Sequence, residues 1–125
     1  MAAPNIVNVA TILGKTVFDA DISDTKSAIL TNAASSDKLL KVNSLIISNI
    51  DGSSSADITV TIENAAGDTV KAKLAHTIAV PSDATLVVIS KDSAIYLEED
   101  MSIHLLASAA GDLSGVCSYD EIDDA

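Results

Sequence analysis

The alternation of apolar and polar residues constrains the fold of this chain more than any other sequence feature. Between Asp57 and Glu63, the apolar residues Ile58, Val60 and Ile62 alternate with polar ones. Successive side chains of a β-strand point to opposite faces, so this period of two predicts a strand that is buried on one face. No long window shows the i, i+3, i+4 spacing of an amphipathic helix. The sequence therefore predicts an all-β chain.

Further segments with strand character follow along the chain, each separated from the next by turn residues. They cover residues 5–12, 15–22, 28–32, 38–50, 57–63, 69–80, 85–90, 94–97, 102–108 and 113–120. Gly14 separates the first two, and segments 38–50 and 57–63 are expected to pair as a central hairpin. A short turn of helix is expected at residues 23–28, where Ser23 or Asp24 could cap it. This pattern predicts an antiparallel β-sandwich, jelly-roll-like, with roughly eight or nine short strands.

The length of 125 residues fits a single domain. We expect one β-sandwich over residues 1–125, with an N-terminal arm at residues 1–8. The acidic residues 120–125 are expected to form a C-terminal tail, either a solvated end or a docking strand. The first residues lack the basic region and apolar core of a signal peptide. The single cysteine, Cys117, cannot form an internal disulfide, which favours assembly in a reducing cytosol.

The charge balance restricts the partners that the protein can have. Seven lysines and no arginine stand against 18 acidic residues, which gives a net charge of -11. Arginine supplies a planar fork for phosphate groups, and lysine does not reproduce that geometry. We therefore expect no direct nucleic-acid partner. We also expect no membrane partner, because the charge opposes anionic lipids and no apolar run is long enough to span a bilayer.

Candidate catalytic and metal-binding groups carry only weak signals. His76 and His104 lie within predicted strands, where one is expected to be partly buried and the other at the surface or an interface. Cys117 has no base or positive charge near it in the sequence and is expected to be a small buried hydrophobe. No Gly-x-Ser-x-Gly elbow and no Gly-x-Gly phosphate cradle is present. We expect no enzymatic activity and no cofactor.

The acidic clusters are the remaining candidates for a metal site. The run with Asp19, Asp21 and Asp24 begins like a calcium-binding loop, but no glycine and no bidentate glutamate follow at the required spacing. The other cluster is Glu98, Glu99 and Asp100 at the end of a predicted strand. We expect solvated carboxylates in turns and no metal site.

Three segments resemble small structural proteins of tailed bacteriophages. The segment AIYLEEDMSI at residues 94–103 is similar to a stretch that such proteins share, and it continues into LASAAGDL at residues 106–113. The ending VCSYDEI at residues 116–122 is similar to the ending of the same proteins, and the start APNIVNV at residues 3–9 resembles proteins from phages of marine bacteria, cyanophages included. The chain departs from the pattern at residues 99–101, where Glu-Asp-Met stands in place of a common Gly-Asp.

The resemblance implies a virion structural protein that is assembled in the cytoplasm of a bacterial host. Within this class we expect a capsid decoration (cement) protein, which binds the outer face of the major capsid shell and stabilises it. A homo-oligomer is expected, with a trimer favoured. The candidate contact with the shell is the nearly uncharged N-terminal arm, at Pro4, Asn5, Ile6 and Val7. Alternatively, Ile6, Val7 and Val9 belong to the first strand of the sandwich.

Two other functions remain open at this stage. The first is a tail, neck or baseplate component of the virion with the same fold. The second is a carbohydrate-binding adhesion module, which requires Tyr96 or Tyr119 to be exposed beside a carboxylate-lined groove. The chain has three aromatic residues in all, which weakens this second alternative.

Overall fold

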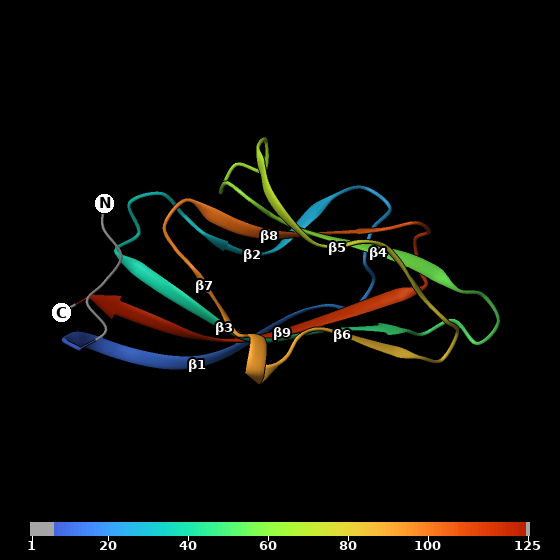
Figure 1. The fold of residues 1–125 in the computed structure, drawn as a ribbon, viewed down its shortest axis with the longest axis horizontal. Helices are drawn as coiled ribbons and strands as arrows, with labels where there is room; N and C mark the ends of the chain where they lie inside the picture. The colour runs from blue at the N-terminus through green and yellow to red at the C-terminus, as the bar shows by residue number, and fades with distance from the viewer. Residues whose placement is uncertain (1–6, 125) are drawn as a thin grey trace.

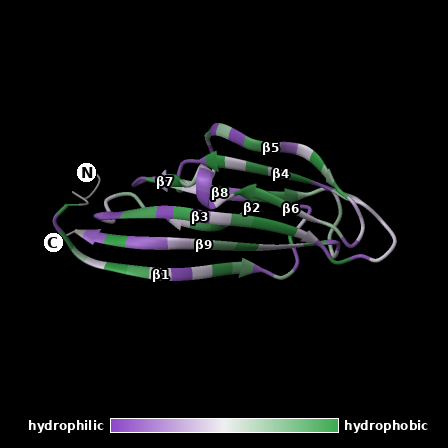
Figure 2. Ribbon diagram, turned by 60° about the horizontal axis from the view of Figure 1, so that its bottom comes forward, coloured by the Kyte–Doolittle hydropathy of each residue, from purple (hydrophilic) through white to green (hydrophobic). Residues whose placement is uncertain are grey.

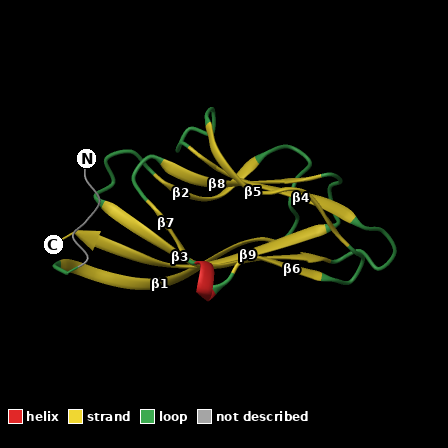
Figure 3. Cartoon of the chain, in the orientation of Figure 1, coloured by secondary structure: helices red, strands yellow, loops and turns green. Residues whose placement is uncertain are grey.

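The computed structural model describes residues 7–124, which form two antiparallel sheets packed face to face (Figures 1 and 3). The first sheet contains, in spatial order, β1 (Val9–Asp19), β9 (Leu113–Asp124), β3 (Lys38–Asn49) and β6 (Thr85–Ile89), and β7 (Ile95–Leu97) also pairs with β3. The second sheet contains β2 (Ser27–Asn32), β8 (Met101–Ala107), β4 (Ala56–Glu63) and β5 (Val70–Val80). A single 3-10 turn, η1 (Lys91–Ser93), precedes β7. No helix in this described part of the chain is long and apolar enough to cross a membrane.

The order of the strands is that of a jelly roll. Strand β1 pairs with β9, β2 with β8, β3 with β6 and β4 with β5, so the first strands pair with the last and the middle ones with each other. This is the arrangement of one long antiparallel ribbon that is wound into two layers. Strand β7 is an addition at the side of β3. The prediction of an antiparallel, jelly-roll-like sandwich is confirmed.

The core lies between the two sheets and follows the alternation in the sequence. In β4, Ile58 and Val60 are fully buried, and they face Leu45 and Ile47 of β3 in the same hydrophobic cluster. Apolar burial of this kind contributes about 25 cal/mol per Å² and is the main stabilising term of the fold. Figure 2 shows the mixture of hydrophobic and hydrophilic residues that results along each strand.

The predicted central hairpin between residues 38–50 and 57–63 is wrong. Strand β3 lies in the first sheet and β4 in the second, and the residues between them cross from one layer to the other. Each strand has one apolar face, and the crossing allows these faces to be buried against each other. Turn residues mark a crossing of this kind as well as a hairpin, so the sequence pattern does not separate the two.

Two local expectations near the N-terminus are also wrong. Gly14 does not separate two strands, because β1 runs through it in continuous register with β9 from Thr11 to Asp19. Residues 23–28 form no helix. Instead, the hydroxyl of Ser23 accepts a hydrogen bond from the backbone N–H of Thr25 at 2.9 Å, which closes a turn before β2.

The acidic C-terminal residues are part of the sheet, where a separate tail was expected. Strand β9 extends to Asp124 and lies between β1 and β3. Ile122 is buried, and Glu121 forms ion pairs with Lys15 at 3.1 Å and with Lys38 at 3.6 Å. Lysines on both neighbouring strands thus compensate part of the charge that made this segment look like a solvated tail.

Candidate interaction surface

A row of four apolar side chains crosses the outer face of the first sheet. The row has one residue from each of four neighbouring strands, and the strand register places them side by side: Phe18 of β1, Val116 of β9, Ile46 of β3 and Val87 of β6. Phe18 is 74% exposed, Val87 55% and Val116 40%. Neighbouring strands are about 4.8 Å apart, so the row spans roughly 14 Å. We call these four residues the apolar row.

The residues on either side of the apolar row carry hydroxyl groups and no charge. On one side lie Thr16, Ser118 and Ser44, and on the other Ser114, Ser48 and Thr85. The charged residues Asp120 and Lys41 first appear one level beyond Thr16 and its neighbours. A protein with a net charge of -11 therefore has an uncharged, partly apolar surface across one sheet. Such a patch is typical of a protein–protein contact.

This surface was not predicted from the sequence, although a signal for it exists. Each of its four strands places an apolar residue of the row directly beside an apolar residue that faces the core. These pairs are Val17-Phe18, Ile46-Ile47, Val87-Val88 and Val116-Cys117. A strand with one solvated face has a polar residue at every second position, so two adjacent apolar residues indicate a second apolar face. That the four pairs lie at one level follows from the register, which the sequence does not show.

The first strand, β1, forms one edge of this sheet and is exposed along most of its length. Gly14 lies at its centre on the outer face, and a Cβ atom there would meet nothing closer than an oxygen of Asp120 at 3.9 Å. Phe18 lies four residues further on the same face. An edge strand of this length with few charges is a template for pairing with another chain.

Of the four predicted contact residues of the N-terminal arm, one lies within the part of the chain that the structure describes. Pro4, Asn5 and Ile6 fall outside the described residues. Val7 is described, precedes the first residue of β1 and is 90% exposed. Strand β1 begins at Val9, so the alternative that these residues belong to the first strand is confirmed for Val9 and is wrong for Val7, which lies in a turn before the strand.

A buried polar cluster lies on the outer face of the second sheet, beneath the turn between β4 and β5. The Glu63 carboxylate is fully buried and accepts hydrogen bonds from Lys26 Nζ at 2.8 Å and from Thr61 Oγ1 at 2.5 Å. Burial alone would raise the pKa of Glu63, but these hydrogen bonds outweigh it and hold the pKa below its usual value. Lys26 Nζ also lies 3.4 Å from the carbonyl oxygen of Gly67. The cluster therefore fastens the turn that leads into β5.

The same cluster contains a serine, a histidine and a glutamate in an arrangement that does not activate the serine. Ser102 Oγ donates to the carbonyl of Asn64 at 2.8 Å and lies 3.0 Å from His104 Nδ1. Glu63 approaches this same Nδ1 at 4.0 Å. In a catalytic triad the two ring nitrogens of histidine serve the two different partners. Here the serine proton is directed at a carbonyl, and a structural role follows.

The other predicted candidates are separated from one another. His76 is exposed on β5 while His104 is buried on β8, and β4 lies between these strands. Among the described residues, no group of three or more potential ligands could hold a metal ion. Asp19 and Asp21 instead accept backbone hydrogen bonds, from Asp21 at 3.2 Å and from Gly111 at 2.7 Å. Cys117 is buried, which raises the pKa of its thiol to about 11 and makes it unreactive.

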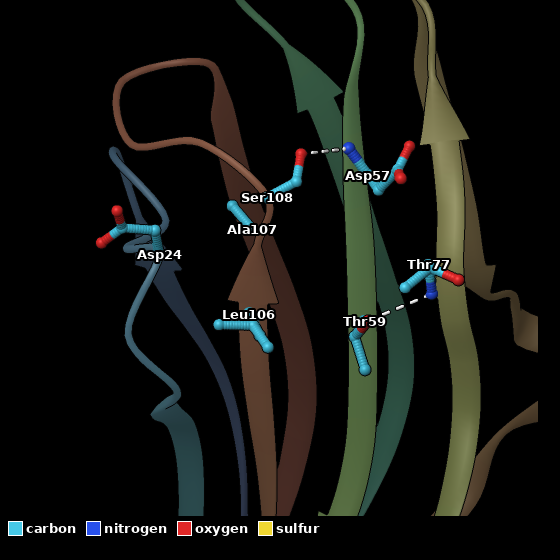
Figure 4. Close-up of a pocket in the computed structure, with 7 residues that line it drawn as sticks. All are labelled: Asp24, Asp57, Thr59, Thr77, Leu106, Ala107 and Ser108. Atoms are coloured by element: carbon cyan, nitrogen blue, oxygen red, sulfur yellow. Dashed lines mark hydrogen bonds between the residues drawn. The ribbon is translucent and has the colours of Figure 1, made fainter.

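One groove of about 370 Å³ lies on the second sheet (Figure 4). Its lining combines two carboxylates with hydroxyl groups and a leucine: Asp24, Asp57, Thr59, Thr77, Leu106 and Ser108, together with Ala107. Neither tyrosine lines it. Tyr119 belongs to the core cluster, and the exposed Tyr96 lies on β7, which pairs with the first sheet. The groove therefore lacks the aromatic ring that the carbohydrate-binding alternative requires.

Comparison with known proteins adds information about the fold. No protein-family model matches the chain, and no curated protein matches it. A solved chain from Bacillus endospore appendages, which form a novel family of disulfide-linked pili, is similar with a TM-score of 0.53 and 17% sequence identity. The likeness covers 92% of this chain and 90% of that chain. At this identity the likeness shows a shared fold.

Proposed function

We propose that the chain is a virion structural protein of a tailed bacteriophage, and specifically a capsid decoration protein that binds the outer face of the major capsid shell. The resemblance of three sequence segments to small phage structural proteins supports this proposal. The observation that carries it in the structure is the apolar row, with its hydroxyl-bearing neighbours, on an otherwise strongly acidic protein. A decoration protein needs one adhesive face and must otherwise remain soluble.

The physical basis of the proposed activity is mass action. Each copy binds the assembled shell and not a free shell subunit, so binding lowers the free energy of the assembled state. Apolar area that is buried at the row supplies the attraction, at about 25 cal/mol per Å². The net charge of -11 keeps unbound copies in solution. The N-terminal residues Pro4 to Val7 are a second proposed contact.

The proposed role is non-enzymatic and uses no cofactor. Two potential nucleophiles support this view. The hydroxyl of Ser102 donates its proton to a backbone carbonyl, and burial raises the pKa of the Cys117 thiol. The fold likeness to a pilus protein is compatible with a structural role. That protein is described as disulfide-linked, whereas the single cysteine of this chain is buried.

A tail, neck or baseplate component is the alternative that the same surface supports. Both functions need a stable sandwich with one adhesive face, and they differ in copy number and in the partner bound.

A binding experiment tests the adhesive face directly. Capsids of the encoding phage that lack this protein are titrated with the purified protein, and bound protein is measured by sedimentation. We expect saturable binding that Val87→Lys weakens at least tenfold, because it places a charge in the apolar row. The matched control is Val70→Lys on β5, which is similarly exposed but lies on the other sheet and should bind normally. Absence of binding by the unmodified protein would contradict the proposal.

A further inference from the structure

We propose that two copies of this chain pair through their β1 edges, antiparallel and about a two-fold axis at Thr16. The pairing would join the first sheets of both copies into one continuous sheet. This inference goes beyond the proposed function, because it names a second copy of the chain as a partner and assigns its contact residues.

The first observation is the regular backbone of β1. Its register with β9 is uninterrupted from Thr11 to Asp19, so its free edge presents an unbroken series of backbone groups. The other edge strands are less suitable, because the irregularities in the pairing of β2, β5 and β6 leave no more than three consecutive residue pairs in register. Regular edges accept an additional strand through backbone hydrogen bonds.

The second observation is that Gly14 and Phe18 are complementary to each other. Both lie on the outer face, where Gly14 leaves open space and Phe18 exposes 74% of its surface. In an antiparallel pair with Thr16 opposite Thr16, residue 14 of one copy lies opposite residue 18 of the other. Each phenyl ring then covers the glycine of the second copy, a cross-strand contact that stabilises glycine in edge strands.

The third observation concerns charge. Lys15 and Asp19 are the only charged residues of β1. In the proposed register, Lys15 of one copy lies opposite the uncharged Val17 and is diagonal to both Asp19 and Lys15 of the second copy, so each diagonal lysine pair is accompanied by an opposite charge. A register shifted to an axis at Lys15 would set two lysines against each other, which is destabilising. Charge and shape therefore favour the same register.

The size of the contact sets the expected strength. Residues 13–19 of each copy take part, and the two phenyl rings together bury on the order of 300–500 Å². The total is near the lower limit of about 1,200 Å² for specific interfaces. We therefore expect a dimer whose population depends on concentration. It would be favoured over the trimer expected from the sequence.

Light scattering after size-exclusion chromatography, over a range of concentrations, gives the association constant of the purified protein. Gly14→Val should weaken association at least tenfold, because its side chain fills the space for the ring while fitting its own strand without a clash. Phe18→Ser should weaken it similarly. Val87→Ser is the matched control at the far end of the apolar row and should change association less than twofold.

Disulfide trapping tests the register. Opposite Cα atoms in an antiparallel pair are about 4.5–5.5 Å apart, within the range that a disulfide accepts. Thr16→Cys should therefore give a covalent dimer under mild oxidation, whereas Lys15→Cys should not, and the buried Cys117 should not react. A protein that stays monomeric and is not trapped by Thr16→Cys would overturn the proposal, as would a dimer that is insensitive to Gly14→Val and Phe18→Ser. Neither outcome would affect the proposed function, which is tested on capsids and virions.

Discussion

The two sheets each end in an edge strand of 11 residues, and these strands, β1 and β5, differ in how they are protected. Strand β5 pairs with β4 through three irregularities, and it carries Lys71 and Lys73 on its exposed length. Strand β1 has a single irregularity near its start and then an unbroken ladder. Irregular pairing and lysines are devices by which natural sheets avoid edge-to-edge association.

The backbone of β5 adds a further difference. Thr77 has a φ of 48°, which is uncommon for a β-branched residue, and its N–H donates to Thr59 Oγ1 at 3.0 Å. This hydrogen bond satisfies a backbone donor at the place where the register between β4 and β5 shifts. The comparison indicates that one edge of the sandwich is kept from pairing and the other is left open. The open edge is also the one that borders the apolar row.

Both edge strands need the folded sandwich beneath them, and Val60→Asp should unfold that sandwich. Val60 is fully buried, so the substitution places an unpaired carboxylate in the core. We expect a loss of roughly 4 kcal/mol or more, comparable with the whole stability of a domain of this size. Circular dichroism should show loss of the cooperative transition. Val70→Asp, at an exposed position of β5, is the control and should unfold normally.

Acidification should lower the free energy of unfolding through Glu63, which lies in the second sheet, the one with the protected edge strand β5. The pKa of this carboxyl is lower in the folded protein than its ordinary value of 4.5, so the unfolded state binds the proton more tightly. The resulting stability is present above about pH 4.5 and is lost as the pH falls through the folded pKa.

Glu63→Gln should remove this part of the pH dependence and lower stability at neutral pH by about 1–3 kcal/mol, since hydrogen bonds to a charged group are lost. Denaturant unfolding as a function of pH measures both effects. A variant with the same acid sensitivity as the unmodified protein would show that other carboxylates are responsible.

A lysine on the open edge should give β1 the protection that β5 already has. Thr16→Lys places two positive charges opposite each other at the proposed two-fold axis, and we expect at least a tenfold loss of association. The site is exposed, so the free energy of unfolding should change by no more than about 0.5 kcal/mol. Unchanged association would mean that the open edge is not the site of pairing.

Salt should have the smallest effect, and its sign is informative. Each copy has a net charge of -11, so the copies repel one another at low ionic strength. Screening over about 8 Å at physiological salt weakens this repulsion. Association through the nearly neutral β1 edge should therefore increase by a few-fold from low to physiological salt. A decrease would indicate that ion pairs dominate the contact.

The period-two pattern was sufficient to predict the fold class, because alternation such as that of Ile58, Val60 and Ile62 is set by the geometry of a single strand. The pattern does not indicate which of the two sheets a strand belongs to. For this reason the sequence predicts a hairpin of β3 and β4, which lie in different sheets. The apolar row depends on the register of four strands, so it emerges only in the structure. Gly14 is expected from the sequence to separate two strands, whereas in the structure it lies within β1 and leaves open space on the outer face of the sheet.

The central claim is that the chain coats a virion through one adhesive face, and the copy number in the particle tests it most directly. Quantitative mass spectrometry of purified virions would compare this protein with the major capsid protein. The account predicts a fixed ratio to the shell protein, with copies in the hundreds. A dozen or fewer copies would assign the protein to the neck, tail or baseplate, and its absence from the particle would contradict the claim.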